Sequence, residues 1–128
     1  MNNVTPLPDR APEGRTLGAV IDDLVDIIAS RVGADPKQSY TASLLSGGPG
    51  KCAKKLGEEG VEAALAAVSG DKAALAGEAA DVLFHLLVTL QVCGVTADEA
   101  AAALNARKGV SGHDEKKQRG VTVTQSEG

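Results

Sequence analysis

Residues 72–93 constrain the fold of this chain more than any other part of its sequence. As an α-helix, the segment would be apolar on almost every side, which is typical of a buried helix. Yet Glu78 and Asp81 lie one turn apart on a narrow polar stripe that also contains His85 and Thr89. Burial of unpaired carboxylates is costly, so these two must be protonated, paired or bound to a metal ion.

The composition of the whole chain also favours helices. Its 128 residues include one Phe, one Tyr and no Trp, whereas Ala occurs 21 times. Ala is the best helix former, and the β-branched and aromatic residues that strands prefer are scarce. Apolar spacing and capping residues predict helices over residues 17–32, 51–69, 72–93 and 97–108, with a short one over 39–46. We therefore predict an all-α fold that resembles a four-helix bundle.

The predicted helices divide the chain into three parts. Residues 1–15 contain three of the five prolines and no periodicity, so we expect a flexible leader. Residues 16–109 form the all-α domain that carries the candidate site. Residues 110–128 are polar and predict a tail over the surface.

Charge and composition exclude several classes of function. A net charge of −4 and a pI of about 5.1 offer no electrostatic footprint for DNA or RNA. The first 15 residues contain no apolar run, so we expect no signal peptide. The longest uncharged apolar run, residues 86–97, falls short of the roughly 20 residues that span a bilayer, so we expect no membrane segment. Cys52 and Cys93 lack metal-binding spacing and predict small buried side chains in a reducing cytoplasm, not a disulfide.

A second group of carboxylates lies on the preceding helix. Glu58, Glu59 and Glu62 share one side of it, away from its large apolar residues. Alone, they would indicate a solvated face with ion pairs four residues apart, such as Lys54–Glu58 and Lys55–Glu59. A two-residue break makes the two helices antiparallel neighbours, so this face can meet the carboxylates of residues 78 and 81.

Four carboxylates in one cleft are tolerable only with a divalent cation. Oxygen ligands select a hard ion, so we predict Mg²⁺, for which Mn²⁺ would substitute. The sequence contains no cluster of Cys and His that would favour Zn²⁺. We expect His85 to support the site by orienting a carboxylate, or to fill the core, and not to bind the metal ion.

Three lysines, Lys51, Lys54 and Lys55, lie at the start of the helix that carries the acidic face. Mg²⁺ held by carboxylates leaves positions for substrate phosphates, and a glycine-rich helix start favours anions. We predict that these lysines bind the phosphates of a nucleotide, although a solvated helix start remains the alternative. GGPGK is not a P-loop, because Leu45 and Cys52 replace the required Gly and Ser or Thr.

Several motifs together resemble one enzyme family. The spacing Glu58-Glu59-x-x-Glu62 followed by Glu78-x-x-Asp81 is similar to that of the all-α, MazG-like nucleotide pyrophosphohydrolases. The segments SYTASLL, GPGK, ADVLFHLLV and VSGHDEKKQR, at residues 39–45, 48–51, 80–88 and 110–119, resemble the phosphoribosyl-ATP pyrophosphohydrolases of histidine biosynthesis. The resemblance covers residues 16–119.

The resemblance implies Mg²⁺-dependent hydrolysis of phosphoribosyl-ATP to phosphoribosyl-AMP and pyrophosphate by a cytoplasmic homodimer. By motif position, it implies that Glu59, Glu62, Glu78 and Asp81 are the metal ligands. Glu58 would bind a further Mg²⁺ or position the attacking water, which makes residues 58, 59 and 62 the candidate catalytic carboxylates. A small chain with an apolar central helix also needs the cover that a second subunit gives.

Recognition of the base is constrained by the lack of aromatic residues. Adenine cannot be bound mainly by stacking unless Tyr40 or a partner subunit supplies the ring, so we expect the metal and the lysines to dominate. Two other functions remain open. One is a house-cleaning nucleoside triphosphate pyrophosphohydrolase with the same metal site, and the other is a helical dimerisation or adaptor module.

Overall fold

The computed structural model describes residue 7 and residues 14–109. These residues form only α-helices, which confirms the all-α prediction: α1 (Leu17–Ser30), α2 (Tyr40–Ser46), α3 (Gly48–Ser69), α4 (Lys72–Cys93) and α5 (Ala97–Arg107). The predicted tail, the motif at 110–119 and almost all of the predicted leader lie outside the described residues.

Side-chain caps fix the positions at which four of the helices begin. A side-chain oxygen accepts a hydrogen bond from the backbone N–H three residues further on at Thr16, Ser39, Asp71 and Thr96. Glu99 accepts in turn from the backbone of Thr96, which completes the capping box expected from the sequence. Gly70 and Gly94 end α3 and α4 with φ of 77° and 74°, a left-handed conformation that suits glycine.

Two helix boundaries differ from the prediction by more than one residue. α3 begins at Gly48 instead of residue 51, because Pro49 fits the first turn, where its missing N–H needs no partner. α1 ends at Ser30 instead of residue 32, since the chain turns over residues 31–34 with Gly33 at a φ of 78°.

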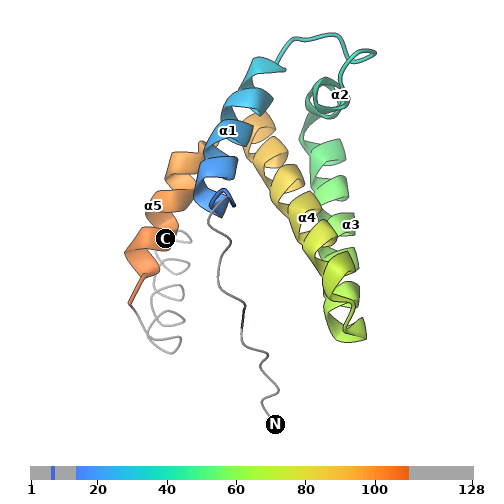
Figure 1. The fold of residues 1–128 in the computed structure, drawn as a ribbon. Helices are drawn as coiled ribbons and strands as arrows, with labels where there is room; N and C mark the ends of the chain where they lie inside the picture. The colour runs from blue at the N-terminus through green and yellow to red at the C-terminus, as the bar shows by residue number, and fades with distance from the viewer. Residues whose placement is uncertain (1–6, 8–13, 110–128) are drawn as a thin grey trace, which may run out of the picture.

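α3 and α4 form an antiparallel hairpin with the most extensive helix contact in the described chain (Figure 1). α1 packs on α4, and α2 packs against both α3 and α4. The buried core lies at the end of the hairpin where α3 begins and α4 ends. It consists of Ile28, Leu44, Cys52, Leu87 and Val88. The packing of α1 and α2 therefore fixes one half of the hairpin.

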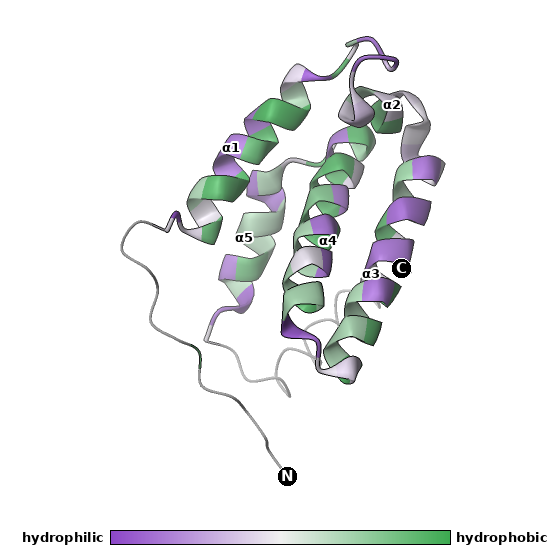
Figure 2. Ribbon diagram, turned by 45° about the vertical axis from the view of Figure 1, so that its right-hand side comes forward, coloured by the Kyte–Doolittle hydropathy of each residue, from purple (hydrophilic) through white to green (hydrophobic). Residues whose placement is uncertain are grey.

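The other half of the hairpin is poorly covered within one chain. The buried residues of α4 all lie in its second half, so the prediction of a helix buried along its length is wrong for a single chain. On α3, Val61, Leu65 and Val68 are 61%, 61% and 84% exposed. Figure 2 shows α3 changing from hydrophilic near its start to hydrophobic near its junction with α4.

By length and composition alone, α4 could also cross a membrane, although the core helix of a soluble protein passes the same test. This helix is longer than the uncharged run considered in the sequence, because it includes Glu78 and Asp81. Together with Glu59 of α3, these two carboxylates form an acidic cluster.

The two cysteines occupy different environments. Cys52 is buried, and its Sγ lies 3.2 Å from the carbonyl oxygen of Leu44. Cys93 is exposed at the last turn of α4, so the prediction that both thiols are buried is wrong for this residue. Both thiols are free in the structure.

Candidate active site

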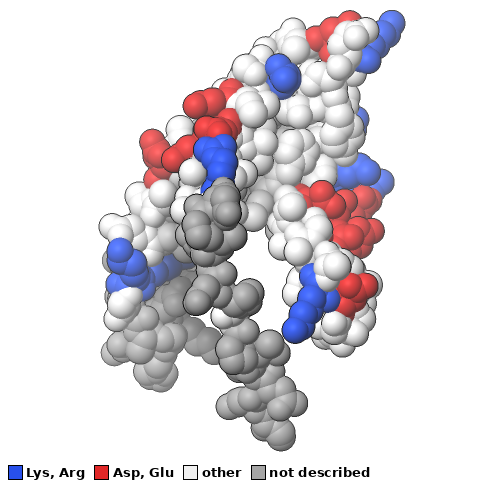
Figure 3. Space-filling model, viewed as in Figure 1, with Lys and Arg blue, Asp and Glu red and all other residues white. Residues whose placement is uncertain are grey.

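The carboxylates of Glu59, Glu78 and Asp81 gather between α3 and α4. One oxygen from each side chain lies within 4.8 Å of the other two. The antiparallel hairpin produces this arrangement, because it brings the middle of α3 beside the first half of α4. Figure 3 shows acidic atoms grouped on this part of the hairpin, with basic atoms adjoining them.

Glu62, the fourth predicted ligand, is not one of these three residues. Its side chain is exposed on α3, yet its charge acts on Glu78. The structure thus brings three of the four predicted ligands together and places the fourth beside them.

One buried oxygen of Glu59 and one of Glu78 have no hydrogen-bond partner among the described residues. Two ionised carboxylates can only accept, whereas a protonated Glu78 can donate to Glu59. That hydrogen bond, followed by burial and by the charges of Glu62 and Glu59, raises the pKa of Glu78 from 4.5 to about 7. Without a cation, this pair therefore retains a proton near neutral pH.

These orphaned acceptors fit a hard divalent cation. Carboxylate oxygens are the ligands that Mg²⁺ and Mn²⁺ prefer, and a cation would relieve the repulsion that now favours a proton. Glu59, Glu78 and Asp81 are the residues able to hold such an ion, and Glu62 is near enough to contribute charge.

Glu58 lies apart from the cluster of three carboxylates. Its Oε2 is 3.7 Å from Nζ of Lys55, and both side chains are partly exposed. This pair is three residues apart in the sequence. The pairs expected at four-residue spacing, Lys54–Glu58 and Lys55–Glu59, do not form. An exposed pair of this kind stabilises the helix little and can exchange one partner for a ligand.

Lys51 contacts α2 instead of pointing freely into solvent. Its Nζ donates to the carbonyl oxygen of Ser43 across 3.4 Å, and its stem lies so close to Gly47 that a Cβ there would collide with it. Lys51 therefore caps the carboxyl end of α2. Lys54 is exposed, and its side chain has neither an ion pair nor a hydrogen bond within residues 14–109.

Tyr40, Phe84 and His85 form an aromatic cluster. The ring centroids of Tyr40 and Phe84 are 6.4 Å apart with 19° between the planes, and His85 meets both rings edge-on at 6.3 Å and 5.1 Å. His85 is 5% exposed, and its Nδ1 has no hydrogen-bond partner in the described chain. Its ring fills the core here, and the hydrogen bond to a carboxylate that would orient the ligand does not form.

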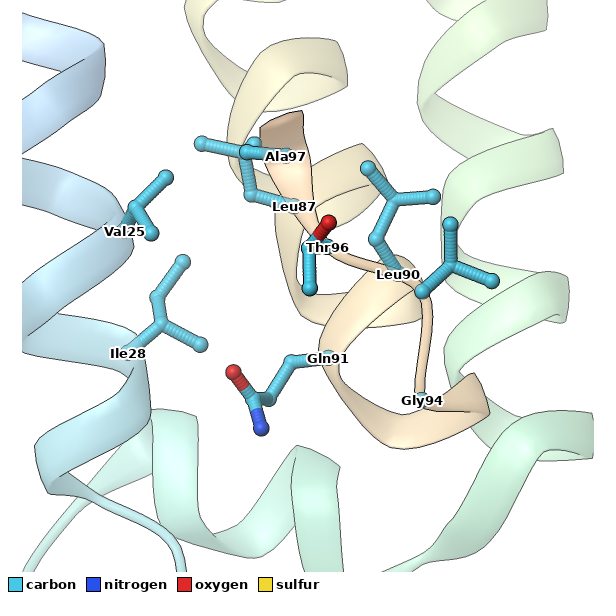
Figure 4. A pocket seen from close by; sticks show the side chains of 9 residues that line it. Val25, Ile28, Leu87, Leu90, Gln91, Gly94, Thr96 and Ala97 are labelled. Atoms are coloured by element: carbon cyan, nitrogen blue, oxygen red, sulfur yellow. The ribbon is translucent and has the colours of Figure 1, made fainter. Parts of the chain in front are cut away.

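A cavity of about 220 Å³ lies elsewhere, between α1, α4 and the start of α5 (Figure 4). Val25, Ile28 and Leu87 line it from α1 and α4, with Gln91 and Thr96 as polar side chains. The lining contains none of the carboxylates, lysines or aromatic rings described above. The candidate site therefore lies on the acidic face of the hairpin and is separate from this cavity.

The sequence profile of the family described as phosphoribosyl-ATP pyrophosphohydrolase matches residues 21–108. The chain belongs to this family. A phosphoribosyl-ATP pyrophosphatase from Methylobacterium radiotolerans is 59% identical over 97 residues, which cover 76% of this chain and 91% of the relative. A protein of the same name from Cereibacter sphaeroides (strain ATCC 17029) is 55% identical over 101 residues, 79% of this chain and 98% of the relative. Another protein of this name, from Dinoroseobacter shibae, is 54% identical over 101 residues, which cover 79% of this chain and 99% of the relative.

The region that matches the phosphoribosyl-ATP pyrophosphohydrolase family includes α2, α3 and α4 in full. It therefore contains the acidic cluster, the three lysines and the aromatic cluster. Sequence reasoning did not assign Phe84 to the site. Two features of the sequence could have drawn attention to Phe84: it is the chain's one Phe, and it follows Asp81 by about one helical turn.

Proposed function

We propose that this chain hydrolyses phosphoribosyl-ATP to phosphoribosyl-AMP and pyrophosphate in histidine biosynthesis, with Mg²⁺ as cofactor. Membership of the phosphoribosyl-ATP pyrophosphohydrolase family and the names of the relatives support the substrate. One observation carries the chemistry: Glu59, Glu78 and Asp81 converge from two helices, and Glu59 and Glu78 each have a buried oxygen without a hydrogen-bond partner in the described chain.

In this proposal, Glu59, Glu78 and Asp81 hold the cation, and Glu62 adds its charge from the next turn of α3. Bound Mg²⁺ would lower the pKa of a coordinated water and polarise the phosphoryl oxygens. Glu58, which lies outside the cluster of three, would position the attacking water or bind a further ion. No Ser, Cys or His nucleophile is required, because phosphoryl transfer depends mainly on positioning and electrostatics.

The lysines would bind the phosphates. Lys54 is exposed without a partner in the described chain, and Lys55 could exchange Glu58 for a phosphate oxygen at little cost. Lys51 could do so only by releasing the carbonyl of Ser43. We therefore propose that Lys54 and Lys55 contribute more to phosphate binding than Lys51 does.

A second copy of the chain would complete the hairpin. Val61, Leu65 and Val68 form an exposed apolar stripe at i, i+4 and i+7 on α3, and the first half of α4 is also poorly covered. Such a surface supports a homodimer. Glu78 and Asp81 interrupt the apolar length of α4 at a cation site, which supports a cytoplasmic enzyme over a membrane span.

Pyrophosphate release from a panel of substrates tests the proposed activity. With Mg²⁺ present, phosphoribosyl-ATP should be hydrolysed faster than ordinary or damaged nucleoside triphosphates. Faster turnover of a plain triphosphate would assign the chain to the house-cleaning enzymes. Absence of release from every triphosphate would favour the adaptor module.

A further inference from the structure

The two aromatic residues of this chain lie in one place. The 128 residues contain one Tyr, one Phe and no Trp, and the rings of Tyr40 and Phe84 lie nearly parallel with centroids 6.4 Å apart. Their elements, α2 and α4, are separated along the chain by the whole of α3. The contact between them therefore arises only from the fold.

Tyr40 is exposed to solvent, yet its ring contacts two other rings. Its residue is 58% exposed, although the ring contacts both Phe84 and His85. A large aromatic ring left exposed to solvent is available for a ligand with a flat apolar face.

Hydrogen bonds cap α2, the helix that carries Tyr40, and connect it to α3. Ser39 caps its amino end at Ala42, and the carbonyls of Ser43 and Leu44 accept from Lys51 and Cys52 of α3. Both ends of this short helix are thereby fixed, one by its own cap and the other to α3. Fixing the ring before the ligand arrives lowers the entropic cost of binding.

Phe84 connects the aromatic pair to the acidic cluster, because it lies on α4 close to Asp81 in the sequence. Phe84 and His85 follow Asp81 by three and four residues, so they lie about one turn, ~5.4 Å, further along the same face of α4. A nucleotide joins its base to its phosphates through a ribose. Phosphates at the carboxylate-bound cation would therefore leave the base near the ring of Tyr40.

We propose that Tyr40, backed by Phe84, is the platform on which the adenine ring of the substrate stacks. This proposal rests on the proposed function and names the residue that recognises the base. It also revises the expectation that the metal and the lysines dominate recognition. Stacking of a base on an aromatic ring corresponds to about tenfold or more in affinity.

Proton NMR of the wild-type protein tests this directly, because its aromatic region holds one Tyr, one Phe and two His residues. Phosphoribosyl-AMP, the product of the proposed reaction, should shift the ring resonances of Tyr40 and Phe84. Ribose 5-phosphate, which lacks the base, should leave them in place. Tyr40 resonances that do not move with saturating phosphoribosyl-AMP would overturn the proposal.

Kinetics provide the second arm of the test. Tyr40→Leu should raise KM for phosphoribosyl-ATP about tenfold and leave kcat within about twofold, whereas Tyr40→Phe should restore the wild-type KM. Circular dichroism checks that both variants are folded. An unchanged KM in Tyr40→Leu would overturn the platform while hydrolysis by the wild type still stands. Base-dependent NMR shifts without hydrolysis of phosphoribosyl-ATP would instead refute the proposed function and leave the platform in place.

Discussion

Glu59 on α3 and Glu78 on α4 face each other across the helical hairpin, and each has one buried oxygen without a hydrogen-bond partner in the described chain. The pair can be satisfied in two ways. A proton on Glu78 lets it donate to Glu59, and a divalent cation satisfies both carboxylates at once. Competition between a proton and a cation for this pair leads to the first two predictions.

The metal-free protein should lose stability as pH rises. The pKa of Glu78 is about 7 in the folded chain and 4.5 in the unfolded reference, so the folded state binds more protons between these values. The contribution of Glu78 to the free energy of unfolding is therefore fully present below pH 4.5 and is lost as pH rises through about 7. Thermal unfolding in EDTA should show this decline, and Mg²⁺ should reverse it above pH 7. A decline that Mg²⁺ leaves unchanged at pH 8 would contradict the prediction.

Glu78→Gln should separate stability from activity. The amide can donate to Glu59 as a protonated carboxyl does, so the metal-free variant should be at least as stable as the wild type at pH 8. It loses a metal ligand, so we expect pyrophosphate release to fall by about a hundredfold or more. Asp26→Asn, an exposed change on α1, is the matched control and should retain full activity. Normal activity in Glu78→Gln would show that the carboxylate does not bind the cation.

The lysines should divide into two classes. Lys54→Met and Lys55→Met should raise KM severalfold without altering the midpoint of urea unfolding, because neither side chain has a hydrogen bond or ion pair to another helix in the described chain. Lys51→Met removes the hydrogen bond to Ser43 and should lower the free energy of unfolding by about 0.5–1 kcal/mol. Equal effects of all three changes on KM, with no loss of stability in Lys51→Met, would contradict this division.

Leu65→Glu should disrupt the proposed dimer. The side chain is 61% exposed at the centre of the stripe formed with Val61 and Val68, so a charge costs little in a single chain and much in an apolar interface. Light scattering after size exclusion should show a dimer for the wild type and a monomer for the variant. Leu104→Glu, which alters an exposed leucine on α5, serves as the control. A monomeric wild type at assay concentrations would refute the dimer.

The sequence predicted the helices well because their boundaries depend on local chemistry. Thr16, Asp71 and Thr96 cap their helices, and Gly94 ends α4, where sequence reasoning placed these signals. The proximity of Glu59 and Glu78 was also predicted, because a two-residue connection makes the two helices antiparallel neighbours.

Burial and side-chain partners could not be predicted in the same way, because they depend on neighbours distant in the chain. The exposure of Cys93 and the contact of Lys51 with α2 follow from how α2 and α4 pack. The Tyr40–Phe84 contact has the same origin, since no local signal indicates where α2 lies. The packing of this short helix therefore accounts for much of what the sequence left open.

Pyrophosphate release from phosphoribosyl-ATP, measured on metal-depleted wild-type protein as Mg²⁺ is added back, tests the central claim most directly. Release should be absent in EDTA, should return with Mg²⁺, and should require a higher Mg²⁺ concentration at pH 6 than at pH 8, because a proton on Glu78 competes with the cation. Undiminished release in EDTA would contradict the assignment of Glu59, Glu78 and Asp81 as the catalytic cation site.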